Sequence, residues 1–85
     1  MVKPSKKRRY QVVVYNSDEM SFNYVIDTFQ TILGYELVQA TSCANLIDQL
    51  GKYVVKSFAE KDHATATADL LLESGFEVEI IDIFA

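Results

Sequence analysis

Cysteine is almost missing from this chain, with only Cys43 among 85 residues. An internal disulfide is therefore impossible, and because small secreted domains usually carry several, the sequence predicts a reducing compartment. No apolar run approaches the roughly 20 residues that cross a bilayer. Residues 1–9 also lack the apolar stretch of a secretory signal. We expect a cytoplasmic protein, or alternatively a protein of the plastid stroma whose transit peptide has been removed.

Groups that carry out catalysis are equally scarce. The one histidine, His63, has no cysteine or second histidine at metal-ligand spacing. A catalytic base also needs a pocket and an orienting partner, whereas the context of His63 predicts an exposed early turn of a helix. The three glycines stand singly, so no phosphate-binding loop is present. The sequence therefore predicts a protein that is not an enzyme and holds no cofactor or metal.

Positive charge is scarce beyond the first residues. Five of the eight basic residues precede Tyr10, which leaves three basic and twelve acidic residues, a net charge of −9, in residues 10–85. Such a body repels nucleic acid and favours cationic ligands. The length and the 49% hydrophobic content predict one globular domain over residues 10–85, after a flexible basic extension over residues 1–9. We expect no membrane partner and a monomer.

The apolar pattern predicts three strands and three helices. Short runs rich in valine and aromatic residues indicate strands, and apolar residues at helical spacing indicate helices. Ser21 is a predicted N-cap, and each helix is followed by a glycine that stops it. The predicted order is β-α-α-β-α-β, with strands over 10–15, 52–58 and 76–81 and helices over 22–33, 36–49 and 60–74. This order predicts an α/β (α+β) fold in which helices cover the apolar face of a three-stranded sheet.

Two segments resemble a known family. YQVVVYNSD at Tyr10–Asp18 and FNYVIDTFQ at Phe22–Gln30 resemble the opening of the ClpS adaptors of ATP-dependent Clp proteases, and the similarity extends over about residues 10–83. The resemblance implies a three-stranded antiparallel sheet packed on three helices. The same element order also resembles the C-terminal domain of ribosomal protein L7/L12, so the fold alone does not decide the function.

The resemblance also implies a function and a site. ClpS adaptors bind proteins whose first residue is Leu, Phe, Tyr or Trp and pass them to the N-terminal domain of a ClpA- or ClpC-type unfoldase. Their site has a polar clasp for the free α-amino group and an apolar pocket for the first side chain. Matching positions here are Asn16, Ser17, Asp18 and Asp48 for the clasp and Met20, Phe22, Val25, Ala44, Ile47 and Val78 for the pocket. The implied unfoldase contact is Glu60, Lys61 and Asp62, together with residues 1–9.

Several of these positions depart from the family pattern. Ser17 replaces the first aspartate of the turn, and Asp48 stands where the family has a histidine. An ionised aspartate accepts hydrogen bonds but cannot donate one to a peptide carbonyl. Phe22 and Ala44 each replace a pocket methionine, which alters the shape of the pocket or lets Phe22 fill it. Two functions remain open: an adaptor with an altered site for the substrate N-terminus, or a ClpS-like interaction module that has lost this recognition and binds another protein.

Overall fold

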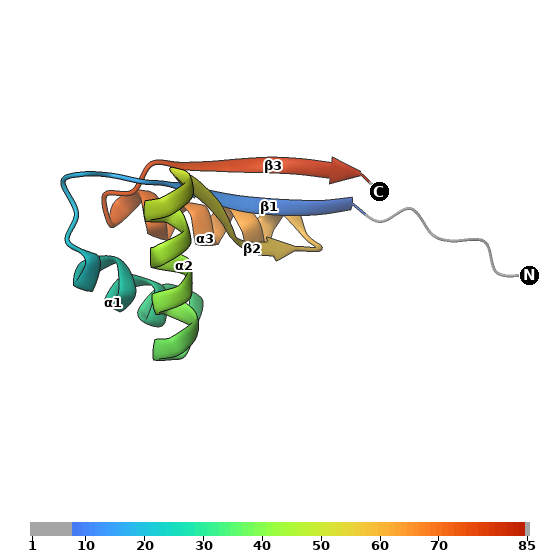
Figure 1. The fold of residues 1–85 in the computed structure, drawn as a ribbon. Helices are drawn as coiled ribbons and strands as arrows, with labels where there is room; N and C mark the ends of the chain where they lie inside the picture. Colours follow the sequence, from blue (N-terminus) through green and yellow to red (C-terminus); the bar gives the residue numbers. More distant parts are fainter. Residues whose placement is uncertain (1–7, 85) are drawn as a thin grey trace, which may run out of the picture.

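The computed structural model describes residues 8–84, and Figure 1 shows their arrangement. The predicted order β-α-α-β-α-β is confirmed. The elements are β1 (Arg8–Tyr15), α1 (Phe22–Leu33), α2 (Leu37–Leu50), β2 (Lys52–Phe58), α3 (Lys61–Glu73) and β3 (Val78–Phe84). Within this range, no helix is both long enough and apolar enough to span a membrane.

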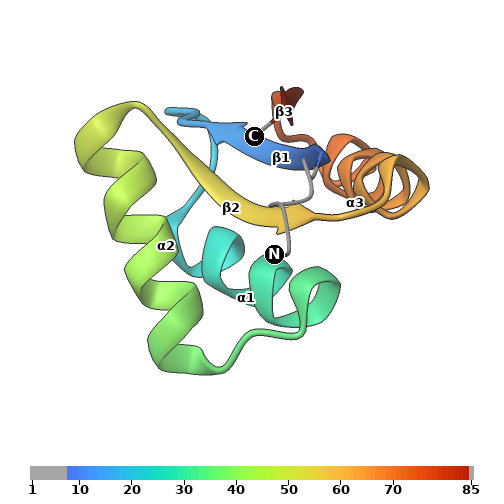
Figure 2. The same ribbon diagram turned by 90° about the vertical axis from the view of Figure 1, so that its right-hand side faces the viewer.

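The three strands form one antiparallel sheet in the order β2-β1-β3, with β1 in the centre. Val14 pairs with Tyr53 of β2 on one side and with Val78 of β3 on the other. β3 therefore forms one edge of the sheet, and Figure 2 shows it on the side away from α1 and α2. This antiparallel sheet with three helices is the α/β fold that the sequence predicts.

β2 has the predicted bounds, but β1 and β3 extend further at one end than the sequence pattern indicates, and β3 begins at Val78 instead of Phe76. β1 begins at Arg8, because Arg8 and Arg9 pair with Phe84 and Ile83 at the end of β3. The Arg8 guanidinium also lies 3.5 Å from the Asp82 carboxylate and 5.0 Å from the centre of the Phe84 ring. Arg8 and Arg9 thus belong to the sheet, although the sequence places them in the N-terminal extension. Residues 1–7 of that extension lie outside the described residues.

The helix ends follow their predicted signals closely. The Ser21 hydroxyl accepts a hydrogen bond of 3.1 Å from the backbone N–H of Tyr24, so Ser21 is the N-cap of α1. Gly34 and Gly51 adopt φ values of 71° and 84° directly after α1 and α2. This left-handed conformation is accessible to glycine at little cost, which explains why both helices end there.

The core lies between the sheet and the helices. Val12 and Val14 of β1, Phe29 of α1 and Leu71 of α3 are its largest fully buried side chains. α3 packs on all three strands, α2 packs on β2, and α1 packs on α2 and α3. Because α1 and α2 are each fixed by such contacts, the surface between them and the end of β1 is held in a defined shape.

Candidate functional site

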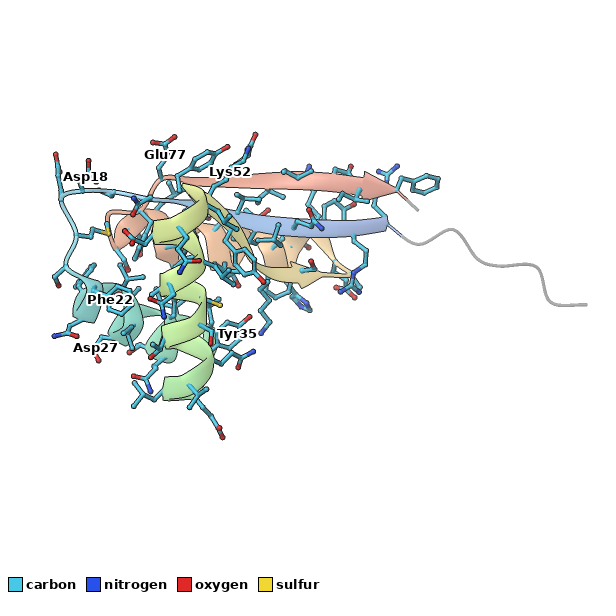
Figure 3. The ribbon with its side chains drawn as sticks, in the orientation of Figure 1. Asp18, Phe22, Asp27, Tyr35, Lys52 and Glu77 are labelled. Carbon is cyan, nitrogen blue, oxygen red and sulfur yellow. The ribbon has the colours of Figure 1, made fainter. Side chains whose placement is uncertain are left out.

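A pocket of about 210 Å³ opens where the segment after β1 meets α1 and α2. It collects nine of the ten residues that the sequence analysis assigns to the clasp and the hydrophobic pocket. These are Asn16, Ser17, Asp18, Met20, Phe22, Val25, Ala44, Ile47 and Asp48. Figure 3 shows Asp18 and Phe22 at the same end of the molecule. Residues from three separate segments of the chain therefore meet at one site.

Backbone hydrogen bonds bring the polar residues of this pocket together. The N–H of Asn16 donates to the carbonyl of Gly51 at 2.8 Å, and the N–H of Gly51 donates to the carbonyl of Ile47 at 2.9 Å. The end of β1 is thereby joined to the last turn of α2. Since Asp48 lies in that last turn, Asn16 and Asp48 are positioned on the same rim of the pocket.

The turn that carries Asp18 is held by Ser17. The Ser17 hydroxyl accepts from the N–H of Glu19 at 3.3 Å, and its carbonyl accepts from the N–H of Met20 at 3.3 Å. A serine hydroxyl supports a turn in this way, as an aspartate carboxylate does more strongly. The Ser17 that departs from the family pattern therefore still stabilises the turn.

The floor of the pocket is apolar and well fixed. Ala44 and Ile47 lie on one face of α2 and are only 3% and 4% exposed. Val25 of α1 is half-buried and packs against the core. Phe22, at the start of α1, lines the pocket and retains 42% of its surface exposed. Phe22 thus contributes a wall and leaves the pocket open.

The rim of the pocket has acidic character. Asn16, Asp18 and Asp48 are all exposed, and no lysine or arginine lines the pocket. Between residues 8 and 84, neither Asp18 nor Asp48 takes part in an ion pair. The site therefore presents two carboxylates without a counter-charge and an amide oxygen beside an apolar floor. An organic cation with an attached apolar group has the matching chemistry.

Val78 is the one predicted pocket residue that lies elsewhere. It pairs with Val14 at the start of β3, is half-buried and packs against the core. The predicted unfoldase contact also lies apart from the pocket: Glu60, Lys61 and Asp62 are exposed at the beginning of α3. The far end of α3 leads to Gly75, which lies beside Met20. The 13 residues of α3 span about 20 Å at 1.5 Å per residue.

His63 and Cys43, whose side chains can react, lie outside the lining of the pocket. His63 is exposed and lies 3.9 Å from the Glu60 carboxylate. Cys43 is buried, and this burial raises the pKa of its thiol, which makes the thiol less reactive. Over residues 8–84, no group of three or more His, Cys, Asp or Glu side chains could hold a metal ion.

A second cavity, which the sequence analysis did not predict, adjoins the pocket. It has a volume of about 520 Å³ and shares Ser17 and Met20 with the pocket, and its other walls include Tyr24, Ser74 and Gly75. The Tyr24 hydroxyl donates to the carbonyl of Ser74 at 2.6 Å, which connects α1 to the end of α3. No sequence motif signals this contact, because it depends on how α3 packs.

Comparison with known proteins agrees with this fold and site. The family model described as ATP-dependent Clp protease adaptor protein ClpS matches residues 5–77. The chain therefore belongs to the ClpS family, a family of protease adaptors and not a catalytic one. No curated protein matches the chain.

A similar solved structure is that of Agrobacterium tumefaciens ClpS2 bound to L-phenylalaninamide. It aligns with a TM-score of 0.70 and 20% sequence identity over 92% of this chain and 98% of that one. At this identity the likeness concerns the fold. Together, family and fold support a role as a Clp protease adaptor.

Proposed function

We propose that the pocket binds the first residue of substrate proteins through a free α-amino group and a bulky hydrophobic side chain. The observation that carries this proposal is the juxtaposition of an acidic rim with an apolar floor, both facing one pocket of about 210 Å³. A protein N-terminus combines an ammonium group and a side chain on a single carbon atom. It therefore engages both halves of the pocket at once.

The rim supplies acceptors for the ammonium group. Carboxylates of Asp18 and Asp48 and the amide oxygen of Asn16 are exposed and face the same pocket. Hydrogen bonds between charged partners are about twice as strong as neutral ones. An acetylated N-terminus loses the charge and most of the donors, so it binds poorly. Asp48 accepts but does not donate, whereas the Asn16 amide nitrogen can donate to the first peptide carbonyl.

The floor selects the first side chain. Val25, Ala44 and Ile47 form the apolar part of the pocket lining, and most of their side-chain surface is already buried against the core. Burying a large aliphatic or aromatic side chain there contributes about 1.5–3 kcal/mol relative to leaving it in water. An alanine at the first position gains little of this energy. We therefore expect preference for Leu, Phe, Tyr or Trp over Ala.

Delivery uses a different surface. We propose that Glu60, Lys61 and Asp62 contact the N-terminal domain of a ClpA- or ClpC-type unfoldase, with residues 1–9 assisting the transfer of substrate. These three side chains are exposed at the opposite end of α3 from Gly75 and Met20. A bound substrate and a bound unfoldase therefore do not compete for one surface. We further propose that the adaptor acts as a monomer in the cytoplasm or the plastid stroma.

Fluorescence anisotropy with labelled peptides tests the proposal. Peptides that differ only in the first residue (Leu, Phe, Tyr, Trp or Ala) are each measured with a free and an acetylated N-terminus. Saturable binding of the four bulky free peptides, without binding of Ala or acetylated peptides, is the expected result. Equal binding of acetylated and free peptides would refute recognition of the amine.

A second function is favoured by the altered rim. Asp48 cannot donate a hydrogen bond to a peptide carbonyl, and Phe22 stands at the mouth of the pocket with 42% of its surface exposed. The second function is that of a ClpS-like interaction module, which binds the unfoldase or another protein without recognising a free N-terminus. Failure of every peptide to bind, with Glu60–Asp62 still needed for unfoldase binding, would favour this function.

A further inference from the structure

Met20 stands between the pocket and the second cavity, and it contributes to the lining of both. Its side chain is half-buried and packs against the core. A methionine has three rotatable bonds and an unbranched thioether, so it moves between neighbouring spaces at little cost. Ser17 also lines both spaces, so Met20 is the adaptable apolar side chain of the boundary that they share.

Gly75, outside the pocket, leaves room for this side chain. A Cβ atom added at Gly75 would lie 3.1 Å from Cε of Met20. This separation is shorter than an ordinary carbon–carbon contact of about 3.5–4.0 Å. The end of the Met20 side chain thus occupies space that exists because residue 75 has no side chain. The φ of 100° at Gly75 also favours glycine.

We propose that Met20 determines the size of first residue that the pocket accepts, and that Gly75 sets the position of Met20 without touching the substrate. With glycine at residue 75, the Met20 methyl group rests against the turn between α3 and β3, on the side of the second cavity. In this position the Met20 side chain does not narrow the pocket for the first residue. This inference rests on the proposed function of the pocket.

The proposal predicts a specific effect of Gly75→Ala. The new methyl group displaces the end of the Met20 side chain, and the space that Met20 borders on its other side is the first-residue pocket. The pocket becomes narrower, which penalises Phe and Trp more than the smaller Leu. The end of the Met20 side chain has to move by only a few tenths of an ångström. The expected change in discrimination is therefore a few-fold, below the roughly 10-fold effect of a whole methylene group inside a pocket. Removal of the Met20 side chain removes the effect.

The test is the ratio of Kd values for a Phe-starting and a Leu-starting peptide, measured with each protein variant. Because both peptides meet the same protein preparation, the ratio does not depend on the folded fraction of that variant. Gly75→Ala is expected to shift the ratio towards Leu by a few-fold, less than the roughly 10-fold effect of a whole methylene group in a pocket. Met20→Ala and the double variant Met20→Ala/Gly75→Ala are expected to share one ratio.

Gly34→Ala is the matched control. Gly34 also has a positive φ, 71°, but an added Cβ atom there meets nothing within 4 Å. It therefore introduces backbone strain without contact to Met20, and its ratio should equal that of the unmodified protein. An unchanged ratio in Gly75→Ala would overturn the proposal. An equal shift with Met20 already replaced by alanine would overturn it too, because the effect would not pass through Met20.

A measurement without peptide completes the test. The chain has two methionines, Met1 and Met20, so the labelled ε-methyl group of Met20 is readily assigned by NMR. A nuclear Overhauser contact from this methyl group to the Gly75 α-protons is expected, and its absence would contradict the proposal. If the unmodified protein binds no peptide although this contact is present, the proposed function fails and the specificity role of Met20 fails with it. Binding with unchanged ratios overturns the inference alone.

Discussion

Replacement of Asp48 by asparagine tests how much of the binding energy comes from charge. The substitution keeps the size of the side chain and one acceptor oxygen and removes the negative charge. Two opposite charges at about 4 Å attract each other by about 1 kcal/mol in water and about 4 kcal/mol at an effective dielectric constant of 20. Asp48 is exposed on the rim of the pocket. The lower part of this range therefore applies, and we expect a loss of about 1–2 kcal/mol, a roughly 5- to 30-fold increase in Kd.

Salt provides an independent check on the same charge. Raising the ionic strength from about 0.1 M to about 1 M shortens the screening length from about 10 Å to about 3 Å. A Phe-starting peptide should therefore bind the unmodified protein more weakly at high salt, and Asp48→Asn should reduce this dependence. Anisotropy titrations at both ionic strengths measure it, with Asp27→Asn as control because Asp27 does not line the pocket. Equal Kd values for Asp48→Asn and the unmodified protein at low salt would refute an ammonium contact at Asp48.

Three further predictions concern stability and pH. Phe29→Ala should lower the free energy of unfolding by about 3–5 kcal/mol in urea denaturation, since Phe29 is 0% exposed; a loss below 1 kcal/mol would contradict its place in the core. Gly51→Ala should lower the free energy of unfolding by about 1–2 kcal/mol, because the φ of Gly51 is 84° and alanine is strained in this conformation. An added Cβ atom meets nothing within 4 Å, so backbone strain is the expected cause. A lower melting temperature measures the loss, and an unchanged one would argue against a left-handed residue at the end of α2. The hydrogen bond to the Glu79 carboxylate raises the pKa of Tyr15. The contribution of this bond to the free energy of unfolding is therefore present below about pH 10 and is lost as the pH rises further. Tyr15→Phe should flatten this loss of stability at alkaline pH, and an identical dependence of stability on pH in both proteins would count against the bond.

The helices could be predicted closely from the sequence because their ends carry local signals. Ser21 caps α1 through its own hydroxyl, and Gly34 and Gly51 supply the left-handed residues that stop α1 and α2. Each of these signals acts within one turn of chain, so no knowledge of the partner elements is needed. The bounds of α1 and α2 accordingly lie within about one residue of the prediction.

The bounds of β2 match the prediction, but the ends of β1 and β3 could not be predicted in the same way, because strand pairing is non-local. Arg8 continues β1 only because Phe84 lies opposite it on β3, 76 positions along the chain. Val78 shows the same limit within the site. Its apolar character suits a pocket wall, but its pairing with Val14 and its contacts with the core place it outside the lining.

Residues of the candidate site were predictable where a single segment of the sequence fixes both their place in the fold and their type of side chain. Asn16 and Asp18 follow β1 directly, and Ala44, Ile47 and Asp48 lie within one helix, so the family pattern places them without reference to packing. No sequence pattern predicted the second cavity. It depends on the contact between the Met20 side chain and Gly75, which lie far apart in the sequence.

We propose above that the pocket between α1 and α2 holds the first residue of a substrate. The most direct measurement is a set of two-dimensional amide NMR spectra of the labelled protein during titration with a Phe-starting peptide and its acetylated counterpart. Only the free peptide is expected to move the signals of Asn16, Ala44, Ile47 and Asp48, with Glu60–Asp62 unaffected. Unchanged pocket signals, or equal shifts with the acetylated peptide, would contradict it.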